Sequence, residues 1–186
     1  PRLPADAEEL STLFATAFED GLVAIGLLAG LGTEQPQDAL DLGLDWLARV
    51  DDITTADALG WLVLGPACLA SGTNIHRVIH KFGNHARPAV RRGVAAMGLA
   101  ALPVKIEGPS SAPLRAKLKV KQLRFVDEAQ SEFVAALCQA FVKDSAPPVQ
   151  KILRRLIRDW VKSDPKAVVA WASQVPGGLP RLLQNE

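Results

Sequence analysis

Residues 45–100 read DWLARVDDITTADALGWLVLGPACLASGTNIHRVIHKFGNHARPAVRRGVAAMGLA, and this stretch decides the fold. Its first half is an apolar run that carries one acid, Asp57, within a sequence patterned as a helix. Its second half ends in the pair Arg91 and Arg92, which opens another long apolar helix. Polar turns containing glycine and asparagine separate these helices. The stretch therefore predicts successive helices, with an acid on one and an arginine on a nearby one.

Helix start signals refine this prediction. Thr54 or Thr55 is expected to cap the helix that contains Asp57, which places Asp57 in the first turn. The helix dipole alone explains a carboxylate in that position, so Asp57 has both a structural and a functional interpretation. One arginine of the pair at 91–92 should face inward, with the alternative that one is at the surface and the other snorkels. Caps are also predicted for three later helices, at Asn74, Ser145 and Asp164.

The chain as a whole is predicted to be all-α. Alanine and leucine dominate, loops are short, and helices come in successive pairs. Helix–turn–helix units of roughly 35–45 residues fit an α-α superhelix of HEAT-like helix pairs, and a globular bundle is the alternative. A single domain is expected over 1–186, with an irregular basic insertion near 103–125. Its run at 115–124 could be a strand, an exposed arm or a fraying helix.

Charge is distributed unevenly along the sequence. Residues 1–70 hold two basic and twelve acidic residues, a net charge of −10. Residues 71–125 hold eleven basic residues and one acid, a net charge of +10, although the whole chain carries only +1. Such a block can mark a surface that binds a polyanion. It can equally pair with the acidic N-terminal third.

Composition also bears on compartment. Cys68 and Cys138 lie in apolar surroundings and are expected to be reduced, buried thiols, which suggests the cytoplasm. The acidic start does not resemble a secretory signal, and the apolar stretch 21–32 is too short to span a bilayer. We expect a cytoplasmic monomer without membrane contact, nucleoid-associated if it binds DNA.

Three histidines cluster at His76, His80 and His85, and the first two could share one helix face. Their neighbours are cations rather than further ligands, so solvated or phosphate-contacting histidines are favoured over a metal site. No metal and no cofactor are predicted. No nucleotide-binding or hydrolase motif is present.

A basic stripe is predicted on the helix near 147–161. Cations recur every three or four residues, and apolar residues at 152, 156 and 160 take the other face. Such a stripe suits phosphates along a nucleic-acid backbone, or it is a solvated face. Its members are Lys151, Arg154 or Arg155, Arg158 and Lys162.

Three places together resemble the AlkD-like DNA alkylation repair proteins. VDDITTADALGWLVLG resembles the family stretch with the catalytic-site aspartate, and Asp57 falls on that position. AVRRGVAAM resembles the arginine-bearing helix, with Arg92 on the site arginine. VQKILRRLIRDWVKSDPKAVVAW resembles a third segment through Gln150, Lys151, Arg158, Asp159, Lys162, Pro165 and Val168. The resemblance covers about residues 37–183.

The resemblance implies a HEAT-like fold with DNA glycosylase members that excise N3- or N7-alkylated purines. It suggests a DNA-binding protein of alkylation-damage repair, a possible hydrolase of N-glycosidic bonds, with double-stranded DNA as partner. Two departures stand out, because Ile53 and Arg155 occupy the positions of the family's two lesion-bordering tryptophans. A non-catalytic HEAT-repeat scaffold for protein–protein interaction is the alternative. The expected DNA-binding residues are Arg77, Lys81, Arg87, Arg91, Lys151, Arg154, Arg155, Arg158 and Lys162.

Overall fold

The computed structural model describes residues 12, 18–103, 127–180 and 183 of the chain. Every regular element within these ranges is helical, which confirms the predicted all-α class. The basic insertion predicted near 103–125 lies outside the described residues, apart from residue 103.

The helices follow one another through short connections. Most are α-helical, while η1 is a π-helix and η2 is a 3₁₀-helix. Their bounds are α2 Phe18–Leu31, α3 Pro36–Leu47, α4 Ile53–Ala58, η1 Leu59–Leu64, α5 Gly65–Ser71, α6 Ile75–Phe82, α7 Pro88–Ala96, η2 Met97–Ala101, α9 Glu128–Phe141, α10 Pro147–Ser163 and α11 Pro165–Gln174.

Two helices begin at the caps that the sequence predicts. Asn74 Oδ1 accepts the His76 N–H at 2.9 Å at the start of α6. Asp164 Oδ1 accepts the Ala167 N–H at 3.1 Å at the start of α11. Each cap satisfies an amide that the helix itself leaves unpaired, so local sequence is sufficient to place these two starts.

The predicted cap of α4 is wrong. The cap is Asp52, whose Oδ1 accepts the N–H groups of Thr54 and Thr55 at 2.9 and 2.8 Å. One carboxylate oxygen thus satisfies two free amides, which a threonine hydroxyl further along could not do. The helix begins at Ile53, so Asp57 lies in its second turn, where the helix dipole is weaker. The helix dipole therefore stabilises the Asp57 carboxylate less than a first-turn position would have implied.

The predicted cap of α10 is also wrong. The residue before the helix is Ala146, not Ser145, and no side chain caps the helix from that position. Asp144 instead accepts the Ala146 N–H at 2.8 Å. A side chain two residues before the cap position therefore satisfies an amide at this turn.

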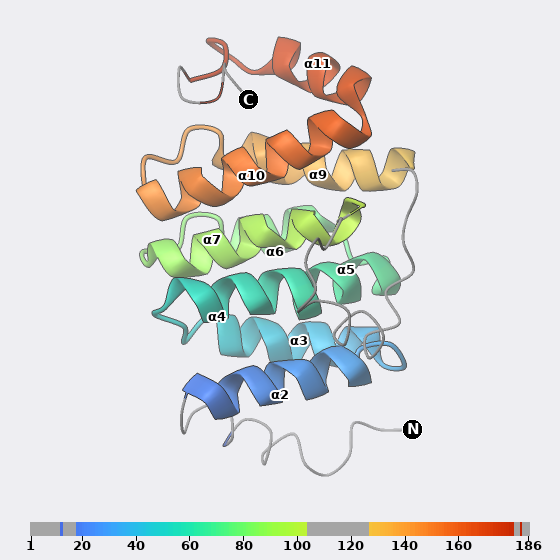
Figure 1. The fold of residues 1–186 in the computed structure, drawn as a ribbon, viewed down its shortest axis with the longest axis vertical. Coiled ribbons are helices and arrows are strands. Elements are labelled where there is room, and N and C mark those ends of the chain that lie inside the picture. Colours follow the sequence, from blue (N-terminus) through green and yellow to red (C-terminus); the bar gives the residue numbers. More distant parts are fainter. Residues whose placement is uncertain (1–11, 13–17, 104–126, 181–182, 184–186) are drawn as a thin grey trace, which may run out of the picture.

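The helices form a two-layered stack along the long axis of the molecule (Figure 1). α4, α7 and α10 lie one above another on the near side, and α7 packs against both of the others. α6 and α9 lie behind them and pack against each other. α2 lies toward one end of the stack and α11 toward the other. Segments some 35 to 60 residues apart are thus neighbours on the near side.

Glycines let the two central helices of this stack approach closely. A Cβ atom at Gly60 of η1 would collide with the carbonyl oxygen of Gly93 on α7. A Cβ at Gly65 would lie 2.5 Å from a carbonyl oxygen of η2. Larger side chains would force the helices apart. The close crossing brings α4 and α7 near enough for Asp57 and Arg92 to meet.

α4, η1 and α5 form one continuous helix over Ile53–Ser71. Gly65 and Pro66 predict a kink in this helix, and the structure has a π-helical turn at Leu59–Leu64, immediately before them. Within the described ranges this is the one helix long and apolar enough to cross a membrane. Half of that span is buried inside the protein, where it packs against α3, α7 and η2.

Both cysteines are buried and unpaired, which confirms the predicted reduced thiols. Burial raises the pKa of Cys68 to about 11 and also raises the pKa of Cys138. The two thiols are therefore protonated at neutral pH and poor nucleophiles.

Candidate functional site

Asp57 and Arg92 form a two-pronged ion pair between α4 and α7, here called the Asp57 fork. Arg92 Nε donates to Asp57 Oδ1 at 2.7 Å, and Nη2 donates to Oδ2 at 2.5 Å. The remaining nitrogen, Nη1, donates to the carbonyl oxygen of Pro148 on α10 at 2.7 Å. A single guanidinium therefore joins three helices that are distant in sequence.

The two partners of this fork differ in exposure. The side chain of Arg92 is 7% exposed, whereas that of Asp57 is 30% exposed. The parallel hydrogen bonds fix the plane of the carboxylate and leave part of it open to solvent. Arg92 is thus the inward-facing member of the arginine pair. The guanidinium of Arg92 is thus held by Asp57 and Pro148 and is largely shielded from solvent, so little of it is accessible to a phosphate.

Arg91 forms a second fork on the other side of α7, here called the Asp144 fork. Its Nε and Nη2 donate to the two carboxylate oxygens of Asp144 at 2.6 and 3.2 Å. Its Nη1 donates to the carbonyl oxygen of His85 at 2.6 Å. Burial acts to raise the pKa of Asp144, but hydrogen bonds from Arg91 and the Ala146 amide, with the Arg91 charge, lower it overall. Of the two adjacent arginines, Arg92 therefore ties α7 to α4 and to the start of α10, and Arg91 ties α7 to the turn before α10.

Trp61 stands one helical turn after Asp57, and the sequence analysis gave it no role. The guanidinium carbon of Arg155 on α10 lies 5.6 Å from the centroid of its ring. Trp61 is half-buried, whereas the other three tryptophans are buried. The spacing of four residues from Asp57 was visible in the sequence. The approach of Arg155 was not, because it depends on how α10 packs.

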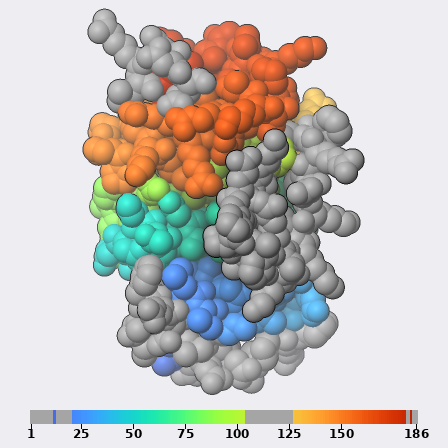
Figure 2. All heavy atoms as spheres, in the orientation of Figure 1, coloured from blue at the N-terminus to red at the C-terminus, as the bar shows by residue number. Residues whose placement is uncertain are grey.

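α10 presents its cations in a row along one face. Lys151, Arg155, Arg158 and Lys162 are all exposed, and these four are here called the α10 stripe. The sequence left open whether Arg154 or Arg155 belongs to the stripe. Arg155 does, because it is exposed, whereas Arg154 is only partly exposed. Ile152, Leu156 and Trp160 are buried on the opposite face, as predicted. Figure 2 shows α10, in orange, above α4, in teal, on the near face.

The remaining expected DNA contacts are dispersed. Arg77 and Lys81 are exposed on α6, which belongs to the layer behind α7. Arg87 is exposed and pairs with Asp51 at 3.1 Å. The structure therefore brings Arg155 of the α10 stripe to Trp61, one turn after Asp57, but does not bring Arg77 and Lys81 to the same layer.

The histidines do not converge. His76 and His80 are exposed on α6, and His85 Nδ1 accepts the Arg87 N–H at 3.3 Å in the turn before α7. Among the residues that the structure describes, no three histidine, cysteine or acidic side chains are grouped so that they could hold a metal ion.

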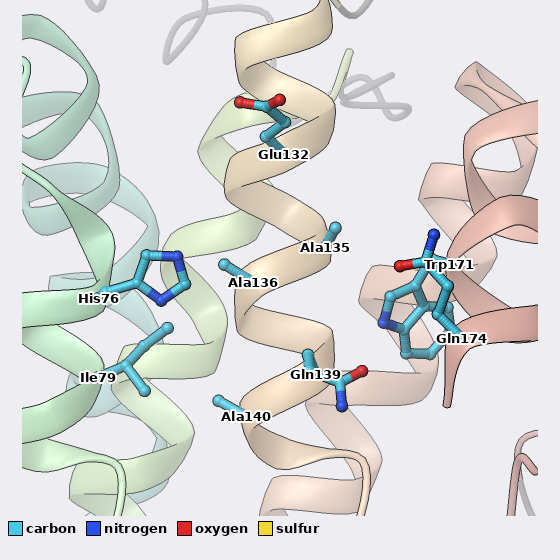
Figure 3. A pocket seen from close by; sticks show the side chains of 9 residues that line it. All are labelled: His76, Ile79, Glu132, Ala135, Ala136, Gln139, Ala140, Trp171 and Gln174. Carbon is cyan, nitrogen blue, oxygen red and sulfur yellow. The ribbon is translucent and has the colours of Figure 1, made fainter. Parts of the chain in front are cut away.

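A shallow groove of about 640 Å³ lies on the other layer, between α6 and α11 with α9 as its floor (Figure 3). Its floor is built from the small side chains of Ala135, Ala136 and Ala140. Trp171 lines one wall, and its indole N–H has no hydrogen-bond partner among the described residues. The groove has no signature in the sequence, since it arises from the packing of three helices.

Searches against protein-family models, curated proteins and solved structures found no match. A functional proposal therefore depends on the chemistry of the site and on the sequence resemblance.

Proposed function

We propose that this protein is a HEAT-like helical protein that binds double-stranded DNA and acts in the repair of alkylation damage. The observation that carries the proposal is Asp57, a partly exposed carboxylate held in a fixed plane by Arg92. Trp61 follows it by one helical turn, and Arg155 of the exposed α10 stripe lies over the Trp61 ring. This arrangement combines a candidate reacting group with an aromatic ring and with cations that can contact a phosphate backbone. The sequence resemblance to AlkD-like proteins supports the same function.

The π-helical turn gives additional support. Such turns are rare and are frequently found at functional sites. In this chain the turn begins two residues after Asp57 and includes Trp61. It therefore alters the spacing of side chains along the helix at the point where the acid and the aromatic ring are presented.

In the catalytic form of the proposal, Asp57 acts on the N-glycosidic bond of a damaged nucleotide. Its carboxylate stabilises the positive charge that develops on the deoxyribose as the bond breaks, or it positions the attacking water. Arg92 is a positioning residue, since it orients the carboxylate from the buried side. No cofactor enters this scheme.

Fluorescence anisotropy with a labelled duplex at two salt concentrations tests DNA binding. Because the α10 stripe would contact phosphates, we expect affinity to fall steeply as salt rises. The logarithmic slope estimates how many phosphates are neutralised. Absence of binding at low salt would contradict the proposal.

Release of free base from duplexes that carry either an N-methylated or an O6-methylated purine tests the catalytic form. We expect release by the wild type and its loss in Asp57→Asn. Asp144→Asn is the matched control, because it removes the same charge from the other fork. Thermal unfolding of both variants separates lost chemistry from lost structure. No release by the wild type, or undiminished release by folded Asp57→Asn, would rule out this form.

The groove on α9 favours a second candidate, a non-catalytic HEAT-repeat scaffold for protein partners. It combines a floor of small alanine side chains with the wide aromatic side chain of Trp171 on one wall. The same anisotropy experiment discriminates the two, since a scaffold without a nucleic-acid role has no salt-dependent binding to duplex DNA.

A further inference from the structure

We propose that the site beside Asp57 accepts uncharged nucleobases, O-alkylated ones included, and excludes purines that N-alkylation has made cationic. The selecting residue is Arg155, through its position over Trp61. The inference rests on the proposed DNA-binding function and specifies the class of lesion that this function would recognise.

The balance of charge at the site is the first reason. The charge of Asp57 is already matched by Arg92, which contacts both of its carboxylate oxygens. Arg155 is 48% exposed and lies 3.8 Å from Asp159, a carboxylate that Lys162 also approaches, at 3.4 Å. Asp159 is thus shared between two cations and only partly offsets the charge of Arg155. A cationic base placed against Trp61 would therefore approach a guanidinium of the same sign.

The aromatic surface is the second reason. Cations are attracted to the face of a tryptophan ring, and this is how an aromatic wall would favour a cationic base. Here the face of the Trp61 ring is already occupied by the guanidinium of Arg155. The other three tryptophans, Trp46, Trp160 and Trp171, are buried and offer no alternative face.

Hydrogen bonding is the third reason. Arginine recognises guanine through the acceptors O6 and N7. Alkylation at N7 removes one of these acceptors and adds a positive charge, and both changes weaken the binding of the base to Arg155. Alkylation at O6 leaves the base neutral and leaves N7 free to accept. Coulomb repulsion and hydrogen bonding therefore discriminate in the same direction.

Three duplexes of one sequence test the proposal. They carry a central guanine, an O6-methylguanine, or a 7-methylguanine stabilised against depurination by a 2′-fluoro sugar. Anisotropy at one salt concentration gives the three dissociation constants. For the wild type we expect the 7-methylguanine duplex to bind about fivefold more weakly than the O6-methylguanine duplex, as one screened unit charge at short range would cause. In Arg155→Gln this ratio should fall to nearly one.

Two variants identify the cause. Arg155→Lys keeps the charge without the planar donors, so a ratio that stays above one attributes the discrimination to charge, and a ratio near one attributes it to hydrogen bonding. Lys151→Gln removes another exposed cation of the α10 stripe and should weaken binding to all three duplexes equally. Equal affinity of the wild type for the two lesions, or an unchanged ratio in Arg155→Gln, overturns the inference and leaves DNA binding intact. Failure of the wild type to bind any duplex overturns both.

Discussion

The Asp57 fork and the Asp144 fork have the same chemistry in different surroundings. Each joins one of two adjacent arginines of α7 to both oxygens of an aspartate. In the Asp144 fork, the arginine and the aspartate are 16% and 10% exposed. In the Asp57 fork, the arginine is more buried, at 7%, while the aspartate is 30% exposed. The aspartate is therefore the more buried partner in the Asp144 fork, and the arginine is the more buried partner in the Asp57 fork.

This difference separates a structural ion pair from a candidate site. Asp144 also accepts the Ala146 amide, and its own carbonyl oxygen accepts from Gln150 at 2.5 Å, so it organises the turn before α10. Among the described residues the carboxylate of Asp57 accepts no backbone amide, and it keeps an accessible edge. A carboxylate that a buried arginine orients and that is partly exposed to solvent is suited to act on a ligand. The same pairing inside a turn stabilises the fold.

The largest expected effect comes from closing the space between the helices that carry the Asp57 fork. Gly60→Ala should destabilise the protein by more than about 3 kcal/mol, above the usual cost of overpacking, because the new Cβ meets backbone rather than a flexible side chain. Gly26→Ala on α2 is the matched control. Nothing lies within 4 Å of its Cβ position, so it should leave stability unchanged or raise it slightly. Urea unfolding of both variants measures the difference, and equal stability would contradict the close crossing.

Removing the aspartate of the Asp57 fork should have the next largest effect. Asp57→Ala leaves the buried Arg92 without a counter-charge, at a cost of about 3 kcal/mol, toward the lower end for a broken buried pair. Arg92→Met should cost less, because water can reach the remaining carboxylate. The double variant should be less destabilised than the sum of the single variants, and a double-mutant cycle by urea unfolding measures this coupling. Strict additivity would show that the fork contributes nothing as a pair.

Acid should weaken the Asp144 fork. Because the folded pKa of Asp144 is lowered, its contribution is fully present above the ordinary carboxyl pKa and is lost as pH falls through the lowered value. Asp144→Asn should therefore reduce stability at neutral pH and flatten the decline of stability in acid. Unfolding free energies measured from neutral to acidic pH provide the test. A variant that follows the wild-type decline would show that another group is responsible.

The smallest expected change in stability comes from the surface next to the Asp57 fork. Lys151→Gln should alter the unfolding free energy by less than about 0.5 kcal/mol, because Lys151 is exposed. If Lys151 contacts a phosphate, the slope of the logarithm of the DNA-binding constant against the logarithm of salt concentration should be about one unit shallower in the variant. An unchanged slope would remove Lys151 from the proposed DNA-binding surface.

Much of the local structure could be predicted from residue patterns. The all-α class, the starts of α6 and α11 at Asn74 and Asp164, and the exposed face of α10 depend on periodicity and caps within a few residues. The cap of α4 was predicted at Thr54 or Thr55, whereas Asp52, to which no cap role was given, stands just before the helix and accepts from both of their amides. The HEAT-like superhelix and the DNA-binding role stay predictions.

The sequence by itself determined that Asp57 and the two adjacent arginines lie in helices and that one helix has a basic face. The tertiary structure decided that Arg92 meets Asp57, that Arg91 turns the other way to Asp144, and that Arg155 lies over Trp61. Those contacts join residues separated by 35, 53 and 94 positions in the chain. Helical periodicity shows only which face of a helix is apolar. The partner across that face is set by how closely whole helices pack, and here the glycines at the crossing of η1 and α7 allow that approach.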